Sequence, residues 1–149
     1  MPTLAMETKE KISALAKVSN GKESECDITE EFLNILDTKI HEAKDMLLER
    51  FEWICMQSPD SARFMYENNV MAGYIPEEGI VSALKHGTLA IGQIGLAETL
   101  QILIGKDQTS DEGMELAKRI EQLFKDRCAE FKKEYSLNFG VYYTPEHNI

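Results

Sequence analysis

The residues best suited to bind a ligand are the glycines of one apolar stretch, "KHGTLAIGQIGLAETLQILIG", residues 85–105. Gly92 and Gly95 separate a short apolar segment from a helical one, so we expect them to form a tight strand-to-helix turn that needs glycine's conformational freedom. Such a turn also presents free amide groups at a helix N-terminus, a place that suits an anion. The spacing is neither a dinucleotide fingerprint nor a P-loop. It favours tight packing, with close approach of a ligand as the alternative.

The cysteines and His41 do not form a second candidate site. Cys26, Cys55 and Cys128 lie far apart and form no CxxC pair, so neither a disulfide framework nor a zinc site is predicted. Cys55 and Cys128 fall within helical patterns, where a thiol acts as a small apolar side chain. His41, with Asp45 one turn further on, is expected on a solvated helix face. We therefore predict no metal ligands in this chain.

The overall charge narrows the classes of partner. The 149 residues contain 26 Asp and Glu against 16 Lys and Arg, a net charge of -10. Phosphate backbones and anionic membranes attract cations, so binding to nucleic acid or to a membrane surface is not expected. The first residues, "MPTLAMETKEK", lack the apolar segment of a signal peptide, and the charge-free run around the glycines is too short to span a bilayer. A soluble, cytoplasmic protein is expected.

Hydrophobic periodicity and glycine or proline stops divide the chain into elements. Long amphipathic helices are predicted over residues 29–57 and 110–135, the second with Ser110 as its N-cap. The two predicted strands are the apolar segment 88–91, expected to be buried, and the aromatic, β-branched segment 137–145. Shorter helices are predicted over residues 4–18, 61–69, 79–87 and 95–105.

This order of elements predicts the fold class. The segment 88–145 is a βαβ unit with two helices in its crossover, so its strands are expected to be parallel with a right-handed connection. Parallel sheets are usually covered on both faces, and two strands alone are therefore expected to belong to something larger. We predict one partial domain, mainly α-helical with two short strands. Its parts are an N-terminal helix and polar loop (1–28), a helical part (29–87) and a strand-helix-helix-strand part (88–145).

Both long helices carry a continuous apolar stripe. The stripe of the first consists of Phe32, Leu36, Ile40, Ala43, Leu47, Phe51 and Ile54. The stripe of the second consists of Met114, Ala117, Ile120, Phe124, Cys128 and Phe131.

Two passages together resemble the anaerobic, class III ribonucleoside-triphosphate reductases, the oxygen-sensitive glycyl-radical enzymes. The passage "LKHGTLAIGQIGLAETL" (84–100) is similar to a strand-turn-helix of that family, and "NFGVYYTP" (138–145) is similar to a later strand that runs into a Thr-Pro loop. The resemblance covers most of the chain. It implies that the chain is a portion of the later half of a ten-stranded α/β barrel, with the glycines where a barrel strand turns sharply into its outer helix.

The resemblance also implies a substrate and a binding loop. The family reduces ribonucleoside triphosphates to deoxyribonucleoside triphosphates by radical chemistry, and its Thr-Pro loop helps to hold the substrate's phosphates. By this match Thr144, Pro145 and Asn148 are the expected phosphate contacts. The two residues that follow Pro145, Glu-His, depart from the small residue that the family usually has there.

The family's radical machinery has no counterpart in this sequence. A thiyl-forming cysteine in its loop motif, a C-terminal glycyl-radical motif and a four-cysteine zinc site are all missing. The resemblance implies that the glycyl radical, installed by an S-adenosylmethionine radical activase, and the structural zinc lie outside this segment. The expected partners are the ribonucleoside triphosphate substrate, the activase and a second copy in a homodimer. We expect a fragment or truncated relative of the reductase that is inactive alone.

Two hypotheses from other classes stay open. The paired amphipathic helices suit a non-enzymatic helical interaction module, and the glycine turn with the Thr-Pro loop suits a small nucleotide-binding protein. Exposed strand edges in such a chain invite pairing between copies, so either dimerisation or a mostly helical packing is expected.

Overall fold

The computed structural model of this protein describes residues 1–19 and 25–143. Its helices are α1 (Pro2–Ser19), α2 (Glu25–Cys55), α3 (Arg63–Glu67), α4 (Val81–Leu84), α5 (Leu96–Ile104) and α6 (Asp111–Tyr135), with a 3-10 turn, η1 (Pro59–Ala62), before α3. The strands are β1 (Thr88–Gln93) and β2 (Asn138–Tyr143). The described chain is mainly helical with two short strands, as predicted.

The two strands form a parallel pair. Thr88 lies opposite Asn138 at one end of the register, and Gln93 lies opposite Tyr143 at the other. Helices α5 and α6 connect the strands, which confirms the predicted βαβ unit with two helices in its crossover. No third strand joins the pair within the described residues. Each strand therefore keeps one edge without a strand partner there.

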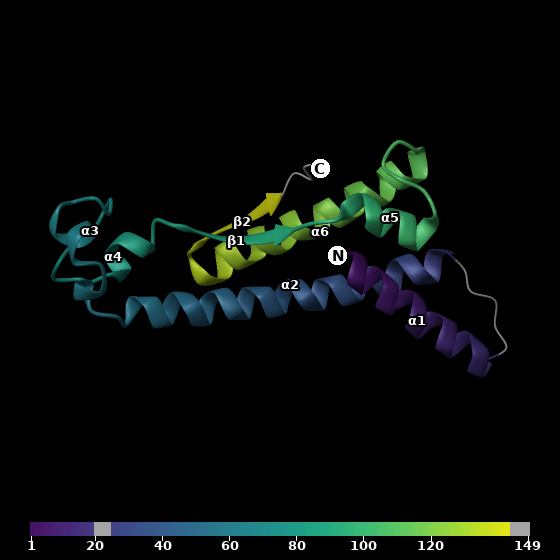
Figure 1. The fold of residues 1–149 in the computed structure, drawn as a ribbon, viewed down its shortest axis with the longest axis horizontal. Coiled ribbons are helices and arrows are strands. Elements are labelled where there is room, and N and C mark those ends of the chain that lie inside the picture. The colour runs from purple at the N-terminus through teal and green to yellow at the C-terminus, as the bar shows by residue number, and fades with distance from the viewer. Residues whose placement is uncertain (20–24, 144–149) are drawn as a thin grey trace.

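β1 is longer and less buried than predicted. It extends two residues beyond the predicted end at residue 91, and its side chains alternate in exposure. The two long helices lie on one side of the strand pair, so only that face of the sheet is covered (Figure 1). The covered side chains of β1 are Leu89, Ile91 and Gln93, and the exposed ones are Thr88, Ala90 and Gly92.

The core lies between α1, α2, α5, α6 and the covered face of the sheet. Helix α6 contributes a stripe of buried residues to this core: Leu116, Ala117, Ile120, Phe124, Cys128 and Phe131. Met114, which was predicted on this stripe, is 42% exposed. Met114 is exposed because a different residue, Gly113, faces the protein at the start of the helix. Gly113 lies so close to the Asp107 carbonyl that no side chain would fit there. The first turn of α6 therefore faces the preceding loop through Gly113, and Met114 points away from it.

Only the first half of α2 belongs to this core. Phe32, Leu36 and Ile40 are at most 2% exposed, whereas Leu47 and Ile54 are only partly covered. Figure 1 shows that α2 continues past the end of α6 and leads to α3 and α4 at one extremity of the molecule. The predicted apolar stripe is confirmed in its spacing, but its second half is only partly buried.

The segment between α2 and β1 is held together locally. The Ser82 hydroxyl is buried, accepts a hydrogen bond from the Ile75 amide at 2.8 Å and donates one to the Gly79 carbonyl at 2.6 Å. The rings of Tyr66 and Tyr74 lie 4.7 Å apart. The helix predicted over residues 79–87 is shorter, since only Val81–Leu84 is α-helical.

Candidate functional site

The carboxyl ends of β1 and β2 meet at one edge of the sheet because the strands are parallel. Gln93 and Tyr143 are the last residues of their strands and lie opposite each other. The predicted glycine turn, Gly92 to Gly95, continues directly from β1 at this edge. Ligands of open α/β sheets usually bind outside the carboxyl ends of the strands. This edge is therefore the first place to look for a functional site.

A side chain from α6 joins the two strand ends. The Gln93 Nε2 group donates a hydrogen bond to a Glu121 carboxylate oxygen. A hydrogen bond from the Tyr143 hydroxyl to Glu121 is the main reason why the pKa of Tyr143 rises to about 12, and burial adds to this effect. Glu121 thus interacts with the last residue of each strand.

This arrangement leaves one buried acceptor unused. Gln93 is 7% exposed, and its Oε1 atom has no hydrogen-bond partner among the described residues. Turning the amide around would place that oxygen against the Glu121 carboxylate, which is unfavourable because neither oxygen can donate. The orientation of Gln93 is therefore set by Glu121, and its carbonyl group faces away from the carboxylate.

The start of α5 provides donors at the same edge. Gly95 is the N-cap residue, with the left-handed conformation φ 78°, and no side chain within the described residues caps the helix. The first amide groups of a helix have no intrahelical acceptor and carry its positive dipole end. Together these groups surround a cavity of about 220 Å³. Its lining consists of Met1, Gln93, Ile94, Gly95, Leu96, Ala97, Glu121 and Tyr143.

The structure explains the two glycines of the turn differently. A Cβ atom on Gly95 would lie 2.6 Å from Pro2 Cγ, so Gly95 is required by both its positive φ and its packing against α1. The Met1 amino group donates a hydrogen bond to the Ile94 carbonyl at 3.4 Å, beside the same contact. Gly92 is exposed, has no positive φ, and would bring a Cβ no closer than 3.9 Å to Tyr142. Tight packing therefore accounts for Gly95 and not for Gly92.

The other sequence-predicted contacts cannot be placed at this cavity. Thr144, Pro145 and Asn148, the expected phosphate contacts, lie outside the described residues. Glu121 and Tyr143 were not predicted from the sequence as site residues. A weak signal existed for Gln93, since it continues the alternation of Leu89 and Ile91 and so was bound to face the core.

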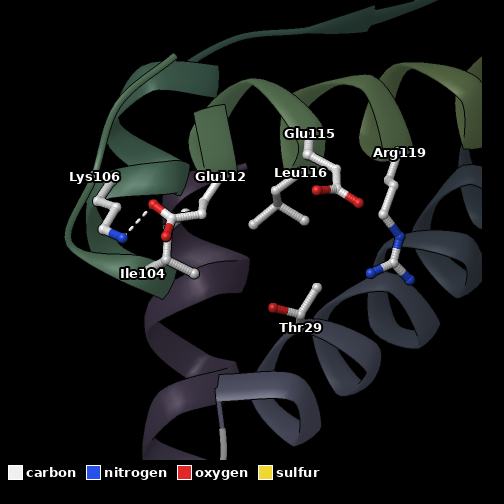
Figure 2. A pocket seen from close by; sticks show the side chains of 7 residues that line it. All are labelled: Thr29, Ile104, Lys106, Glu112, Glu115, Leu116 and Arg119. Carbon is white, nitrogen blue, oxygen red and sulfur yellow. Dashed lines mark hydrogen bonds and ion pairs between the residues drawn. The ribbon is translucent and has the colours of Figure 1, made fainter. Parts of the chain in front are cut away.

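A second cavity, of about 190 Å³, lies between α2, α5 and α6 (Figure 2). It contains cations, but each of them is paired with a carboxylate. Lys106 forms an ion pair with Glu112, as Figure 2 shows, and Arg119 forms one with Glu30 at 2.6 Å. Glu115 adds another acidic group to the lining. This cavity has neither free cations nor an unpaired buried group among the described residues, so the strand-end cavity is the better candidate.

The surroundings of Cys55, Cys128 and His41 favour a structural role for these side chains over a chemical one. Burial raises the pKa of both Cys55 and Cys128, which disfavours a reactive thiolate. His41 keeps a side chain that is 44% exposed, as predicted for a solvated helix face, and Asp45 is 69% exposed. His41 contacts the Asp37 carbonyl at 2.9 Å through Nδ1 and lies edge-on to Phe131 at 5.2 Å.

Metal and membrane sites are not evident in the described part of the chain. Across residues 1–19 and 25–143, no group of three or more His, Cys, Asp or Glu side chains is arranged to hold a metal ion. These residues therefore do not fit a four-cysteine zinc site. None of the described helices is both long enough and apolar enough to cross a membrane.

Comparison with known proteins assigns the family. A search of curated proteins found no match. A family model described as anaerobic ribonucleoside-triphosphate reductase matches residues 1–149, the full length of the sequence. This match covers the βαβ unit, the glycine turn and the strand-end cavity together with the helices that support them. The chain belongs to the anaerobic ribonucleoside-triphosphate reductase family.

Proposed function

We propose that this chain is a portion of the catalytic α/β barrel of a reductase that converts ribonucleoside triphosphates to deoxyribonucleoside triphosphates. In this proposal the chain is a single partial domain that supplies two adjacent barrel strands and the helices outside them. The observation that carries it is a parallel strand pair covered on one face only, in a chain of the reductase family. Parallel sheets occur almost only with both faces covered.

The uncovered face of the sheet supports this proposal. Thr88, Ala90 and Gly92 are exposed on β1, and Tyr142 on β2 is 58% exposed. Three of these four side chains are small, so another layer of protein or a ligand can come close to the backbone there. Further barrel strands would pair with the unpaired strand edges, and the face bearing these residues would then line the interior of the barrel.

The strand-end cavity is the proposed substrate-facing part of the chain. The amide groups at the start of α5 suit a phosphate group, since a helix N-terminus attracts anions. Thr144, Pro145 and Asn148 are proposed as additional phosphate contacts, on the resemblance of their loop to that of the family. Glu98 in the first turn of α5 opposes an anion, so backbone donors rather than net charge would provide the affinity.

We place the radical chemistry outside this chain. Cys55 and Cys128 lie in helices with their pKa values raised by burial, and the described residues offer no zinc site. A glycyl radical, installed by an S-adenosylmethionine radical activase, and a structural zinc would be supplied by other parts of the enzyme. The chain alone is expected to be inactive, to work in the cytoplasm, and to belong to a homodimeric enzyme.

Two measurements on the purified chain test the proposal. Titration calorimetry with each of the four ribonucleoside triphosphates should detect binding that inorganic triphosphate competes away. Incubation with activase, S-adenosylmethionine and reductant should yield no deoxyribonucleotide. A chain that binds none of the nucleotides is not substrate-facing, and a chain that forms deoxyribonucleotide is a complete catalyst rather than a portion of one. If the chain binds a nucleotide but its organism encodes no other part of the barrel, the result would favour the small nucleotide-binding protein instead.

A helical interaction module is the second candidate function, and exposed apolar residues favour it. On the second half of α2, Met46 is 70% exposed and Trp53 is 60% exposed. Phe64 of α3 is also exposed, at 73%. Light scattering that finds only monomers, together with no binding of a dye for apolar surfaces, would contradict this candidate.

A further inference from the structure

Another cavity, of about 300 Å³, lies in the segment between α2 and β1, at the extremity of the molecule that α3 and α4 occupy (Figure 1). Two tyrosines, whose ring centres lie 4.7 Å apart, and two prolines contribute to its lining: Tyr66, Tyr74, Pro59 and Pro76. The wall is fixed beside Tyr74, because the amide of Ile75 donates a hydrogen bond to the buried Ser82 hydroxyl. Concave, aromatic and preformed cavities of this kind are the ones that ligands usually occupy.

Tyr66 brings a polar group without a protein partner to this cavity. The residue is only 8% exposed and belongs to the lining. Among the described residues its hydroxyl makes no hydrogen bond, and the oxygen is not sealed from solvent as Gln93 Oε1 is. The hydroxyl of a buried tyrosine usually finds a partner. A group bound in the cavity is able to supply it.

The charges of the lining favour a cation. Its ionisable side chains are two carboxylates, Asp60 and Glu67, and one basic group, Arg63. Arg63 and Glu67 form an ion pair of 2.6 Å. Asp60 has no basic partner within the described part of the chain, and its carboxylate accepts a hydrogen bond from the Ser58 hydroxyl at 3.2 Å. One negative charge of the lining is therefore left uncompensated.

An aromatic ring, a hydroxyl and a carboxylate in one cavity match an organic cation. Cations are attracted to the face of a tyrosine ring. Guanidinium and ammonium groups are pure hydrogen-bond donors, which hydroxyl and carboxylate oxygens accept. We propose that this cavity binds an arginine or lysine side chain of a partner protein, with its charged group beside Asp60 and the Tyr66 hydroxyl and against the ring of Tyr74. This inference is independent of the site proposed at the strand ends.

Exposed apolar residues indicate that the cation belongs to a polypeptide. Phe64, Val70 and Ile75 each adjoin a lining residue in the sequence, and they are 73%, 54% and 41% exposed. A free amine would leave these side chains in water. The residues on either side of a bound arginine are able to cover them, and burial of apolar surface is favourable.

The test titrates the full chain with two peptides. One is acetyl-Leu-Arg-Leu-amide, and the other has citrulline in place of arginine, which keeps the shape of the side chain and removes its charge. NMR of the tyrosine rings gives each dissociation constant. We expect the arginine peptide to bind roughly tenfold more tightly, the combined effect of a cation–π contact and an exposed ion pair. Added salt should reduce this preference.

Three variants locate the effect. Asp60→Asn removes the charge at an exposed position and should reduce the preference to roughly threefold, the part that the ring supplies. Tyr74→Leu, which removes the ring, should reduce it by a similar factor. The control Glu77→Gln removes an exposed carboxylate of the same segment that does not line the cavity, so it should keep the full preference. Circular dichroism checks that each variant is folded. If Tyr74→Leu does not fold, Asp60→Asn carries the test alone.

Several outcomes would overturn the proposal. Equal binding of the two peptides, or no binding of either at millimolar concentration, excludes a cation site. A preference that Asp60→Asn leaves unchanged, or that Glu77→Gln reduces as much, assigns the attraction to the acidic surface rather than to this cavity. Agmatine, which carries the guanidinium without a peptide, should bind more weakly than the arginine peptide. Equal affinity of agmatine would overturn the protein partner.

Discussion

Replacing Gly95 with alanine should destabilise the chain far more than the same change at Gly92 or Gly105. At φ 78°, an alanine would carry a left-handed backbone penalty of about 1–2 kcal/mol. Its methyl group would also lie 2.6 Å from Pro2 Cγ and 2.7 Å from Pro2 Cδ. That is about 1 Å closer than the normal carbon contact of ~3.5–4.0 Å. Overpacking of this kind costs about 1–3 kcal/mol, so the expected loss totals about 2–5 kcal/mol.

Two other glycines are matched controls for these two contributions. Gly105 has φ 67° and open space where a methyl group would be added, so Gly105→Ala should lose only the backbone part, about 1–2 kcal/mol. Gly92 has neither a positive φ nor a close neighbour, and Gly92→Ala should stay within about 0.5 kcal/mol of the native chain. Adding Pro2→Ala to Gly95→Ala should recover the overpacking part.

Urea unfolding followed by circular dichroism measures each free energy of unfolding. Coupling between the changes at Gly95 and Pro2 of about 1 kcal/mol or more is expected, because the two residues are in contact. Gly95→Ala with a loss no larger than that of Gly105→Ala would refute the packing of the turn against α1. The same conclusion would follow if Pro2→Ala gave no recovery.

Two further substitutions test the contacts of α6. Arg127 makes two hydrogen bonds to the Asp37 carboxylate, 2.6 and 2.9 Å long, so Arg127→Met should lower the free energy of unfolding at pH 7 by about 1–3 kcal/mol. Arg127 also lowers the pKa of Asp37, so this stabilisation is present above the ordinary carboxyl pKa of about 4 and disappears as the pH falls through the lowered one. Urea titrations should therefore show the difference between the two proteins shrinking as the pH falls below about 4, and a difference that does not shrink would contradict the ion pair. Glu121→Gln should return the pKa of Tyr143 from about 12 toward the usual value of about 10, as followed by NMR of the tyrosine ring carbons. An unchanged Tyr143 titration would show that Glu121 does not accept its hydrogen bond.

The sequence predicted the elements that have clear starts and stops. Ser110 caps α6 by accepting a hydrogen bond from the Gly113 amide, and Gly105 ends α5 in a left-handed conformation, as expected from their residue types. These signals are local, because a cap or a glycine stop acts within one turn of the helix. The parallel pairing of the strands was also predictable, from the order of elements along the chain. Two strands that are joined through helices are connected by a crossover and therefore run parallel.

The contacts between distant elements were not predictable in the same way. Periodicity identifies which face of a helix is apolar, but not whether protein covers it, so the exposure of the second half of α2 was missed. The site depends on Glu121, which lies 28 residues from Gln93 in the sequence. Its neighbours are set by the strand register and by the rotation of α6, and the sequence shows neither. Of the two glycines predicted to form the turn, Gly95 lies in it and Gly92 belongs to β1. The buried acceptor beside the turn became visible only in three dimensions.

The most direct test of the central claim is to map where a ribonucleoside triphosphate binds on the chain by amide NMR. The claim predicts chemical-shift changes centred on Gln93, Gly95, Leu96 and Ala97, at the carboxyl ends of the strands, with little change around Lys106 and Arg119. Changes centred on the Lys106 and Arg119 cavity, or no changes at saturating nucleotide, would contradict the assignment of the strand ends as the substrate-facing site.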